Sequence, residues 1–255
     1  MNDSNGQAAE ESFISHLIEL RDRLVKATYG LGLVCIALMI WPGPAMIYDF
    51  LAQPMLKSLP AGSQMIATGV ISPFLVPMKV TLLAAFVIAL PWVLYQAWAF
   101  IAPGLYAHEK KLIAPLVVSS TLLFISGVAF CYFLVFGRVF HFINEFAPQS
   151  IHVAPDIENY LDFIMSMCLA FGVTFEVPVV VVVLVRMGIV PLEKLKAIRP
   201  YVIVGAFVIA AIVTPPDVVS QFSLALPMWL LYEFGLLVAP FFARVTKSPD
   251  PAETL

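Results

Sequence analysis

The residue of greatest chemical interest in this chain is Glu176, a carboxylic acid in the middle of a long apolar stretch. It precedes Arg186 by ten residues, which on an α-helix places it about 15 Å along the axis from that cation. If the helix crosses a membrane, the carboxyl lies near the middle of the bilayer, where ionisable groups are costly and usually functional. We therefore interpret Glu176 as a polar site that faces a groove or a partner helix. A neutral carboxyl, hydrogen-bonded within the helix packing, is the alternative interpretation.

Three other polar residues lie in similar apolar surroundings and are weaker candidates of the same kind, namely Gln96, Gln221 and Glu233. Gln221 follows Asp217 by four residues. On a helix, this spacing puts both side chains on one face.

Two further carboxylates, Glu19 and Glu109, lie among basic residues. Glu19 precedes Arg23 by four residues, and on spacing alone the two form an exposed helical ion pair worth about 0.3–0.5 kcal/mol. Glu109 stands in the sequence HEKK, which is typical of a solvated loop. Spacing alone therefore assigns neither residue a function.

Residues with catalytic or metal-binding spacing are absent from the sequence. The four His residues are scattered, and Cys35, Cys131 and Cys168 stand singly in different apolar stretches. This pattern predicts neither a disulfide framework nor a metal site. The chain also has no glycine-rich nucleotide loop, nucleophile elbow or HExxH sequence. We therefore predict a protein that is not an enzyme and has no cofactor.

The basic residues are concentrated in four short segments, 21–26, 110–111, 186–199 and 244–247, which contain eleven of the fourteen Lys and Arg residues. The exceptions are Lys57, Lys79 and Arg138. Long uncharged stretches separate the segments: 22 residues between Lys26 and Asp49, 28 between Lys79 and His108, and 26 between Lys111 and Arg138. About 20 apolar residues suffice for a membrane-spanning helix. If the chain crosses six times, all four basic segments lie on one side, which the positive-inside rule identifies as the cytoplasm.

The composition supports a membrane protein, since 61% of the residues are hydrophobic and 12% are charged, against about 25% charged in a soluble domain. The fold class predicted is an all-α integral membrane protein with six transmembrane helices and cytoplasmic N- and C-termini.

The acidic start, with Asp3, Glu10 and Glu11, differs from a signal or transit peptide. Because the basic residues are segregated by membrane side, membrane lipid is the expected surrounding and no nucleic-acid partner is expected.

The segment 12–26 repeats apolar residues at helical spacing, so we expect an amphipathic helix along the cytoplasmic interface. A first span then runs over about 27–41, and a long outer connection over 46–72 is expected to form an ordered cap. Further spans are predicted over about 73–98, 115–140 and 161–185. The domains are a cytoplasmic tail at 1–11, a six-helix membrane domain at 12–240 and a second cytoplasmic tail at 241–255.

The last two spans are expected to be short. Only 14 residues separate Pro200 from Pro215, and 15 separate Asp217 from Glu233. Fourteen residues of helix reach about 21 Å, whereas a hydrocarbon core is about 30 Å thick. We therefore expect the bilayer to thin there, or these helices to pack behind others.

Four motifs in a fixed order closely resemble the TatC family, the receptor subunits of the twin-arginine translocase: FISHLIELRDR at 13–23, WAFIAPGLYAHE at 98–109, FGVTFEVP at 171–178 and TPPDVVSQ at 214–221. The resemblance covers about residues 12–240. It implies a six-helix protein of the bacterial cytoplasmic membrane that recognises the Arg-Arg signal peptides of folded proteins. It also implies TatA-like and TatB-like single-span partners, a homo-oligomer within a receptor complex, and transport driven by the proton-motive force.

By motif position, the resemblance carries the family's signal-peptide contacts over to Glu19, Glu109, Arg21 and Phe100. It also assigns a membrane-embedded polar or partner site. This site consists of Glu176, Gln221, Asp217 and Pro54. Two adjacent guanidinium groups require carboxylates that accept forked hydrogen bonds, which the ammonium groups of a Lys pair do not match.

The alternative to a protein-export receptor is a secondary transporter of a small solute or ion, in which Glu176 is the coupling carboxylate. The unlike halves of the chain oppose it, because the outer connection at 46–72 has no counterpart in the second half and both short spans lie there. An intramembrane enzyme would need a nucleophile and base, which the sequence does not show at recognisable spacing.

Overall fold

The computed structural model describes residues 3–58, 65–101, 113–146, 154–214 and 217–242. Over these ranges the chain is helical, apart from short connections and one isolated parallel bridge between Ile66 and Asp156. The chain divides into two compact units, within Met1–Gly172 and within Val173–Leu255, and each is described by itself. The predicted all-helical class is confirmed.

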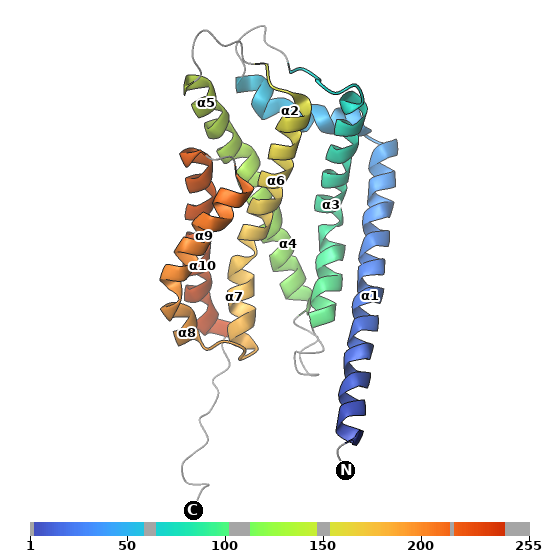
Figure 1. The fold of residues 1–255 in the computed structure, drawn as a ribbon, viewed down its shortest axis with the longest axis vertical. Coiled ribbons are helices and arrows are strands. Elements are labelled where there is room, and N and C mark those ends of the chain that lie inside the picture. The colour runs from blue at the N-terminus through green and yellow to red at the C-terminus, as the bar shows by residue number, and fades with distance from the viewer. Residues whose placement is uncertain (1–2, 59–64, 102–112, 147–153, 215–216, 243–255) are drawn as a thin grey trace, which may run out of the picture. The chain divides into compact units, whose positions relative to one another are not determined.

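The first unit contains α1 (Asp3–Ile40), α2 (Pro44–Ser58), α3 (Ser72–Ile101), α4 (Ile113–Phe130), a π-helical turn (Cys131–Val135) and α5 (Phe136–Phe146). It also contains most of α6 (Ile157–Phe175). The second unit contains α7 (Val177–Arg186), α8 (Leu192–Ala197), α9 (Arg199–Val213) and α10 (Val218–Phe242). Figure 1 shows α1 and α3 lying side by side as long rods.

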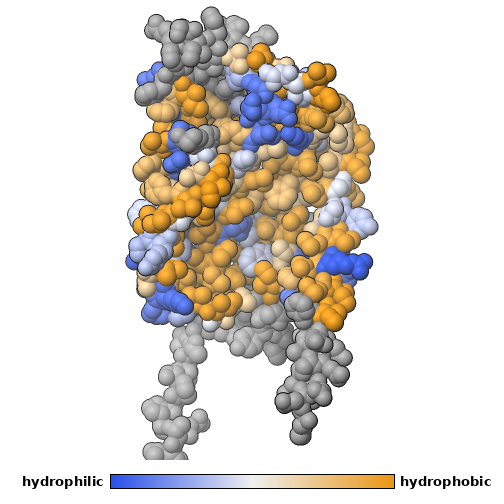
Figure 2. Space-filling view, viewed as in Figure 1, coloured by the Kyte–Doolittle hydropathy of each residue, from blue (hydrophilic) through white to orange (hydrophobic). Residues whose placement is uncertain are grey.

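Five helical stretches are long and apolar enough to cross a membrane: Ile14–Ile40, Ser72–Ile101, Ile113–Ile143, Ile157–Arg186 and Val218–Phe242. α9 is a shorter apolar helix of 15 residues. Large apolar side chains are strongly exposed along these helices, including Leu33 at 71% and Phe241 at 87%. Hydrophobic residues also dominate the face drawn in Figure 2. A surface of this kind requires lipid as its solvent.

The expectation that 12–26 forms a separate interfacial helix is wrong, because α1 runs without interruption from Asp3 to Ile40. The segment contains no proline or glycine, so nothing in it breaks the helical hydrogen bonds. α1 ends only before Pro42, and Gly43 makes the turn into α2 with a φ of 93°, a backbone angle that favours glycine.

Within the outer connection predicted over 46–72, residues 46–58 belong to the helix α2, and residues 59–64 lie outside the described part of the chain. α2 contacts α3 and α5, and in Figure 1 it lies across the end of α3. Val76, Val80 and Leu161 are fully buried there, with Ile47 and Leu51 of α2 packed against them. This cluster joins α2, α3 and α6 at one end of the unit.

The fourth predicted span is broken at Glu176, where α6 ends and α7 begins. Pro178 occupies the first turn of α7, and its ring cannot occupy the interior of a continuous α-helix without disturbing it. The backbone N–H of Glu176 donates to the Val173 carbonyl at 3.0 Å, which tightens the chain at the break.

Of the two spans predicted to be short, only the first is short. α9 has 15 residues and extends about 22 Å. α10 has 25 residues and extends about 37 Å, so the prediction of a short last helix is wrong. The prediction failed because Glu233 was taken as the end of the span, whereas its carboxylate pairs with Arg199 at 2.9 Å and the helix continues to Phe242.

Candidate functional site

Glu19 and Arg23 lie on α1, one turn apart, at the part of the helix that contacts α3. Arg23 Nη2 and Glu19 Oε1 are 3.4 Å apart, and the two side chains are 27% and 34% exposed. Arg23 Nη1 also donates to Oε1 of Gln96 on α3 at 3.3 Å. The Gln96 side chain is buried, so one guanidinium bridges an accessible carboxylate and a buried amide.

Phe100 lies one turn beyond Gln96 on α3 and stacks on His16 of α1, with the ring centroids 4.4 Å apart. Arg21 is exposed on α1. The structure thus places three of the four predicted signal-peptide contacts, Glu19, Arg21 and Phe100, on the paired helices α1 and α3. Glu109, the fourth, lies outside the described residues.

The predicted polar site in the second unit contains Asp217, which caps the N-terminus of α10. Its Oδ1 accepts a hydrogen bond from the Ser220 backbone N–H at 2.7 Å. The Gln221 N–H donates to the Asp217 carbonyl at 3.2 Å. A carboxylate in this position satisfies donors at the start of a helix and interacts favourably with its dipole. Asp217 and Gln221 therefore lie one helical turn apart at the start of α10.

Glu176 is partly buried at the break between α6 and α7, and its carbonyl accepts the first hydrogen bond of α7 from the Val180 N–H at 3.0 Å. Pro54 lies within α2 and is partly buried. Pro54 belongs to the first unit, and Glu176, Asp217 and Gln221 belong to the second. Their grouping into one site stays a prediction.

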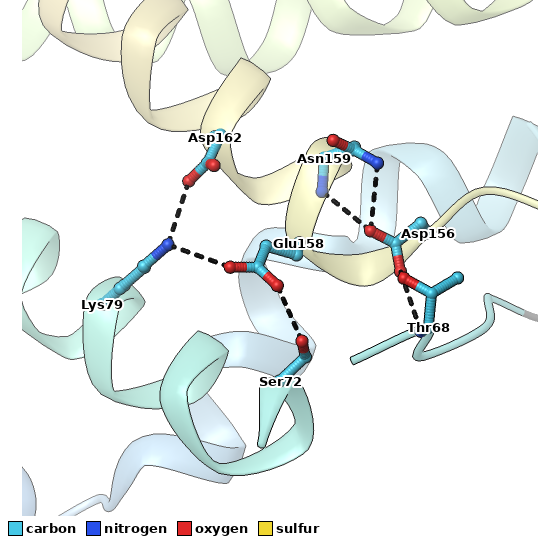
Figure 3. A network of polar contacts seen from close by, with 7 residues as sticks. All are labelled: Thr68, Ser72, Lys79, Asp156, Glu158, Asn159 and Asp162. Carbon is cyan, nitrogen blue, oxygen red and sulfur yellow. Dashed lines mark hydrogen bonds and ion pairs between the residues drawn. The ribbon is translucent and has the colours of Figure 1, made fainter. Parts of the chain in front are cut away.

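A polar network that the sequence analysis did not predict joins α3 to α6 (Figure 3). Lys79 Nζ lies 3.5 Å from Oε1 of Glu158 and 3.4 Å from Oδ1 of Asp162. The Ser72 hydroxyl donates to the other Glu158 oxygen at 2.7 Å. A lysine in an otherwise uncharged span needs a partner, and two carboxylates four residues apart share a helix face. The lysine within an uncharged span and the two carboxylates one turn apart are the features of the sequence that could have indicated this network.

The same network fixes the start of α6. Asp156 Oδ1 accepts hydrogen bonds from the Thr68 backbone N–H and hydroxyl at 3.1 and 2.9 Å, and Oδ2 accepts from the Asn159 backbone and side chain, each at 3.1 Å. The Thr68 backbone bond is the largest influence that holds the pKa of Asp156 below its ordinary value, followed by the bond from Asn159. Asp156 therefore ties the segment before α3 to the N-terminus of α6.

The described ranges contain no candidate metal site, because no three His, Cys, Asp or Glu side chains among them are close enough together to hold an ion.

The family comparison agrees with this helical architecture. The family model described as Sec-independent protein translocase protein (TatC) matches residues 15–227. The chain belongs to the TatC family. The match includes Glu19, Glu109, Glu176 and Gln221 within one aligned range.

Three bacterial TatC proteins illustrate the relationship. The protein of Halothiobacillus neapolitanus is 52% identical over 248 residues, covering 95% of this chain and 67% of its own length. The Haemophilus influenzae protein is 49% identical, with 91% and 90% covered. The Escherichia coli protein is 47% identical, with 91% and 89% covered.

A solved structure has the same fold. It is described as the crystal structure of the twin-arginine translocase receptor TatC, and it superposes with a TM-score of 0.78 at 35% identity. The superposition covers 89% of this chain and 99% of that one. Family membership makes this chain a multi-pass membrane protein of protein transport and not an enzyme, as predicted. It also favours protein export over the alternative of a small-solute transporter.

Proposed function

We propose that this protein is the receptor subunit of a twin-arginine translocase and that it binds the Arg-Arg signal peptides of folded cargo through Glu19 and Glu109. The observation that carries the proposal is the TatC family match, which spans both residues. The accessibility of the Glu19 carboxylate supports it, because a buried acid would be closed to a peptide.

The chemistry of the ligand fits these two acids. Each guanidinium of an Arg pair presents parallel N–H groups, and a carboxylate accepts two of them in a forked arrangement. Arg21 and Phe100 lie on the same two helices as Glu19 and extend this binding surface. Such a site distinguishes an Arg pair from a Lys pair, since an ammonium group offers no planar fork.

The first prediction tests this site with Glu19→Gln and Glu109→Gln. Each change keeps the size of the side chain but removes the charge that strengthens the contact. The affinity for a synthetic Arg-Arg signal peptide should fall by about 1.5–3 kcal/mol for each variant, measured with the purified protein in detergent.

The matched control is Glu193→Gln, which removes an exposed carboxylate from α8, and this variant should bind the peptide like the unchanged protein. A Lys-Lys peptide reports non-specific charge attraction. If both Glu19→Gln and Glu109→Gln keep full affinity, the Arg-Arg pair is bound elsewhere.

Family membership supports the remaining parts of the proposal. The protein resides in a bacterial cytoplasmic membrane with both termini in the cytoplasm, crosses it six times through the domain 12–240, and forms homo-oligomers within a receptor complex. It organises TatA-like and TatB-like single-span partners for export driven by the proton-motive force. Deletion should leave folded proteins with Arg-Arg signals in the cytoplasm, whereas loss of a solute transporter would not affect them.

A further inference from the structure

Three contacts fix how α1 lies against α3 at the part of the helices that carries Glu19. The contacting positions on α3 are four residues apart, and those on α1 follow one face of the helix. The contacts are the His16–Phe100 ring stack at 4.4 Å, the bond from Arg23 to Gln96 at 3.3 Å, and the bond from Trp92 Nε1 to the Lys26 carbonyl at 2.9 Å.

This register places the Arg23 guanidinium between two acceptors of different kinds. One is Oε1 of Gln96, a neutral amide oxygen of a buried residue. The other is Oε1 of Glu19, a carboxylate oxygen in a side chain that is 34% exposed. Arg23 can therefore remain hydrogen-bonded to Gln96 while its second nitrogen leaves Glu19.

The guanidinium of Arg23, which contacts the Glu19 carboxylate in this structure, is the same chemical group as the guanidinium of the proposed ligand's arginine. We propose that Arg23 is an internal stand-in for the ligand's guanidinium: it occupies the Glu19 carboxylate until an arginine displaces it, and Gln96 holds it aside afterwards. This inference rests on the proposed function of Glu19.

Displacement is easy because the Arg23–Glu19 pair is weak. Both side chains are partly solvated, the separation of 3.4 Å is long for a charge-assisted bond, and an exposed pair one turn apart contributes little. A ligand arginine that binds Glu19 with two parallel bonds replaces a single long contact. The stand-in therefore lowers the affinity modestly and selects against cations that cannot form the fork.

The proposal predicts that removal of Arg23 raises the affinity for the peptide. Arg23→Gln removes the competitor and one repelling positive charge, so the affinity for an Arg-Arg peptide should rise by about two- to fivefold at low salt. A residue that merely orients Glu19 would give the opposite result, a loss of affinity. Lys26→Gln is the matched control, because it removes a charge from an exposed position one turn away on α1 and should change the affinity less.

Gln96 supplies the second arm of the test. In Gln96→Leu, Arg23 keeps Glu19 as its acceptor, so the peptide affinity should fall by about two- to fivefold. In the double variant Arg23→Gln with Gln96→Leu, this loss should disappear, because the loss acts through Arg23. A loss that persists in the double variant assigns Gln96 a purely structural role and overturns this arm of the proposal.

The experiment uses the full chain in detergent and a synthetic Arg-Arg peptide, with the thermal unfolding midpoint of every variant measured in parallel. Arg23→Met, which keeps the apolar stem, replaces Arg23→Gln if the latter unfolds. Glu19→Gln separates the two proposals. If Glu19→Gln weakens binding but both Arg23 variants leave it unchanged or weaken it, the stand-in is wrong. If Glu19→Gln has no effect, the proposed function of Glu19 fails instead.

Discussion

Several polar side chains within the apolar helices of this protein are held by specific partners. Arg23 donates to Gln96, Arg199 pairs with Glu233, and the Tyr232 hydroxyl donates to the Leu195 carbonyl at 2.8 Å. A polar group that is removed from water without a partner is costly, and the cost is greater where lipid is the surrounding. Each pair therefore also fixes the relative position of two helices.

The second prediction concerns Glu176, the carboxyl at the break between α6 and α7. We expect it to offer a hydrogen bond to a polar residue of a partner helix or an inserted signal. Glu176→Gln should then be mild in an export assay at matched protein level, because the Gln amide also donates. Glu176→Ala should reduce export or partner crosslinking and leave Arg-Arg peptide binding unchanged.

The competing mechanism is a coupling carboxylate that must gain and lose its proton. It predicts that Gln is as damaging as Ala, since neither side chain titrates. A Glu176→Gln variant that inserts and assembles normally but exports nothing would therefore refute the hydrogen-bonding role.

The sequence identified candidate residues but not most of their contacts. The Glu19–Arg23 pair was predictable because both residues lie on one helix, one turn apart. The bond from Arg23 to Gln96 joins residues 73 positions apart, and it depends on the register of α1 against α3, which the spacing along either helix does not determine. Lys79 and its two carboxylates were missed for the same reason.

At the scale of helices, proline residues determine where helices break and glycine residues determine how closely helices pack. Pro178 lies in the first turn of α7, directly after the break at Glu176. In the second unit, a Cβ on Gly235 of α10 would lie 3.0 Å from the Pro178 Cα and 3.1 Å from the Val181 Cβ. The absence of a side chain at Gly235 thus allows α10 to pack closely against α7.

Element boundaries were the least predictable part of the fold. Periodicity correctly indicated helices, but α1 continues through the segment expected at the interface, and α10 continues past Glu233. In both cases charged residues were taken as the end of a span. The charges are accommodated by ion pairs, Glu19 with Arg23 and Glu233 with Arg199, so they do not end the helix.

The third prediction tests the polar network between α3 and α6. Lys79→Met leaves Glu158 and Asp162 facing each other without the cation between them, and like charges one turn apart repel. The thermal unfolding midpoint in detergent should fall by about 1–3 °C, and the difference from the unchanged protein should shrink at high salt.

Lys57→Met is the control for Lys79→Met, because Lys57 is another lysine outside the four basic segments and is exposed on α2. Asp162→Asn combined with Lys79→Met completes a double-mutant cycle. If the two single changes are simply additive, the Lys79–Asp162 contact does not stabilise the fold.

The fourth prediction concerns partner binding at the short helix α9. Because α9 extends only about 22 Å, we expect the bilayer to thin beside it or a partner helix to dock there. Disulfide scanning along 203–213 should give adducts with TatA-like or TatB-like helices. The argument from helix length does not apply to residues 222–232, because α10 is long enough to cross the bilayer. A disulfide scan along 222–232 therefore serves as the comparison. Partners that co-purify without any adduct to α9 would place the contact elsewhere.

At the scale of the whole molecule, the distribution of charge and the order of the helices specify a topology. Within the first unit, α1, α3 and the α4–α5 rod run in alternating directions, and α2 lies at the end of the unit opposite the N-terminus (Figure 1). The charge pattern predicts on which side of the membrane each end of these helices lies, because the positive-inside rule acts over whole loops and needs no knowledge of contacts, and this orientation stays a prediction. Of the three basic residues outside the four segments, Lys79 is neutralised by Glu158 and Asp162.

The fifth prediction is this topology, tested by labelling single-Cys variants in intact cells after Cys35, Cys131 and Cys168 have been replaced. Probes at positions 5, 109, 194 and the C-terminus should react only after the membrane is opened, because the positive-inside rule predicts that the regions near the basic segments lie in the cytoplasm. Probes near Ser63 and Ser150 should react with an impermeant reagent added outside. Position 194 is decisive, since it lies between α7 and α9: labelling from outside would remove one crossing before it and refute the six-span arrangement, even though the family assignment would stand.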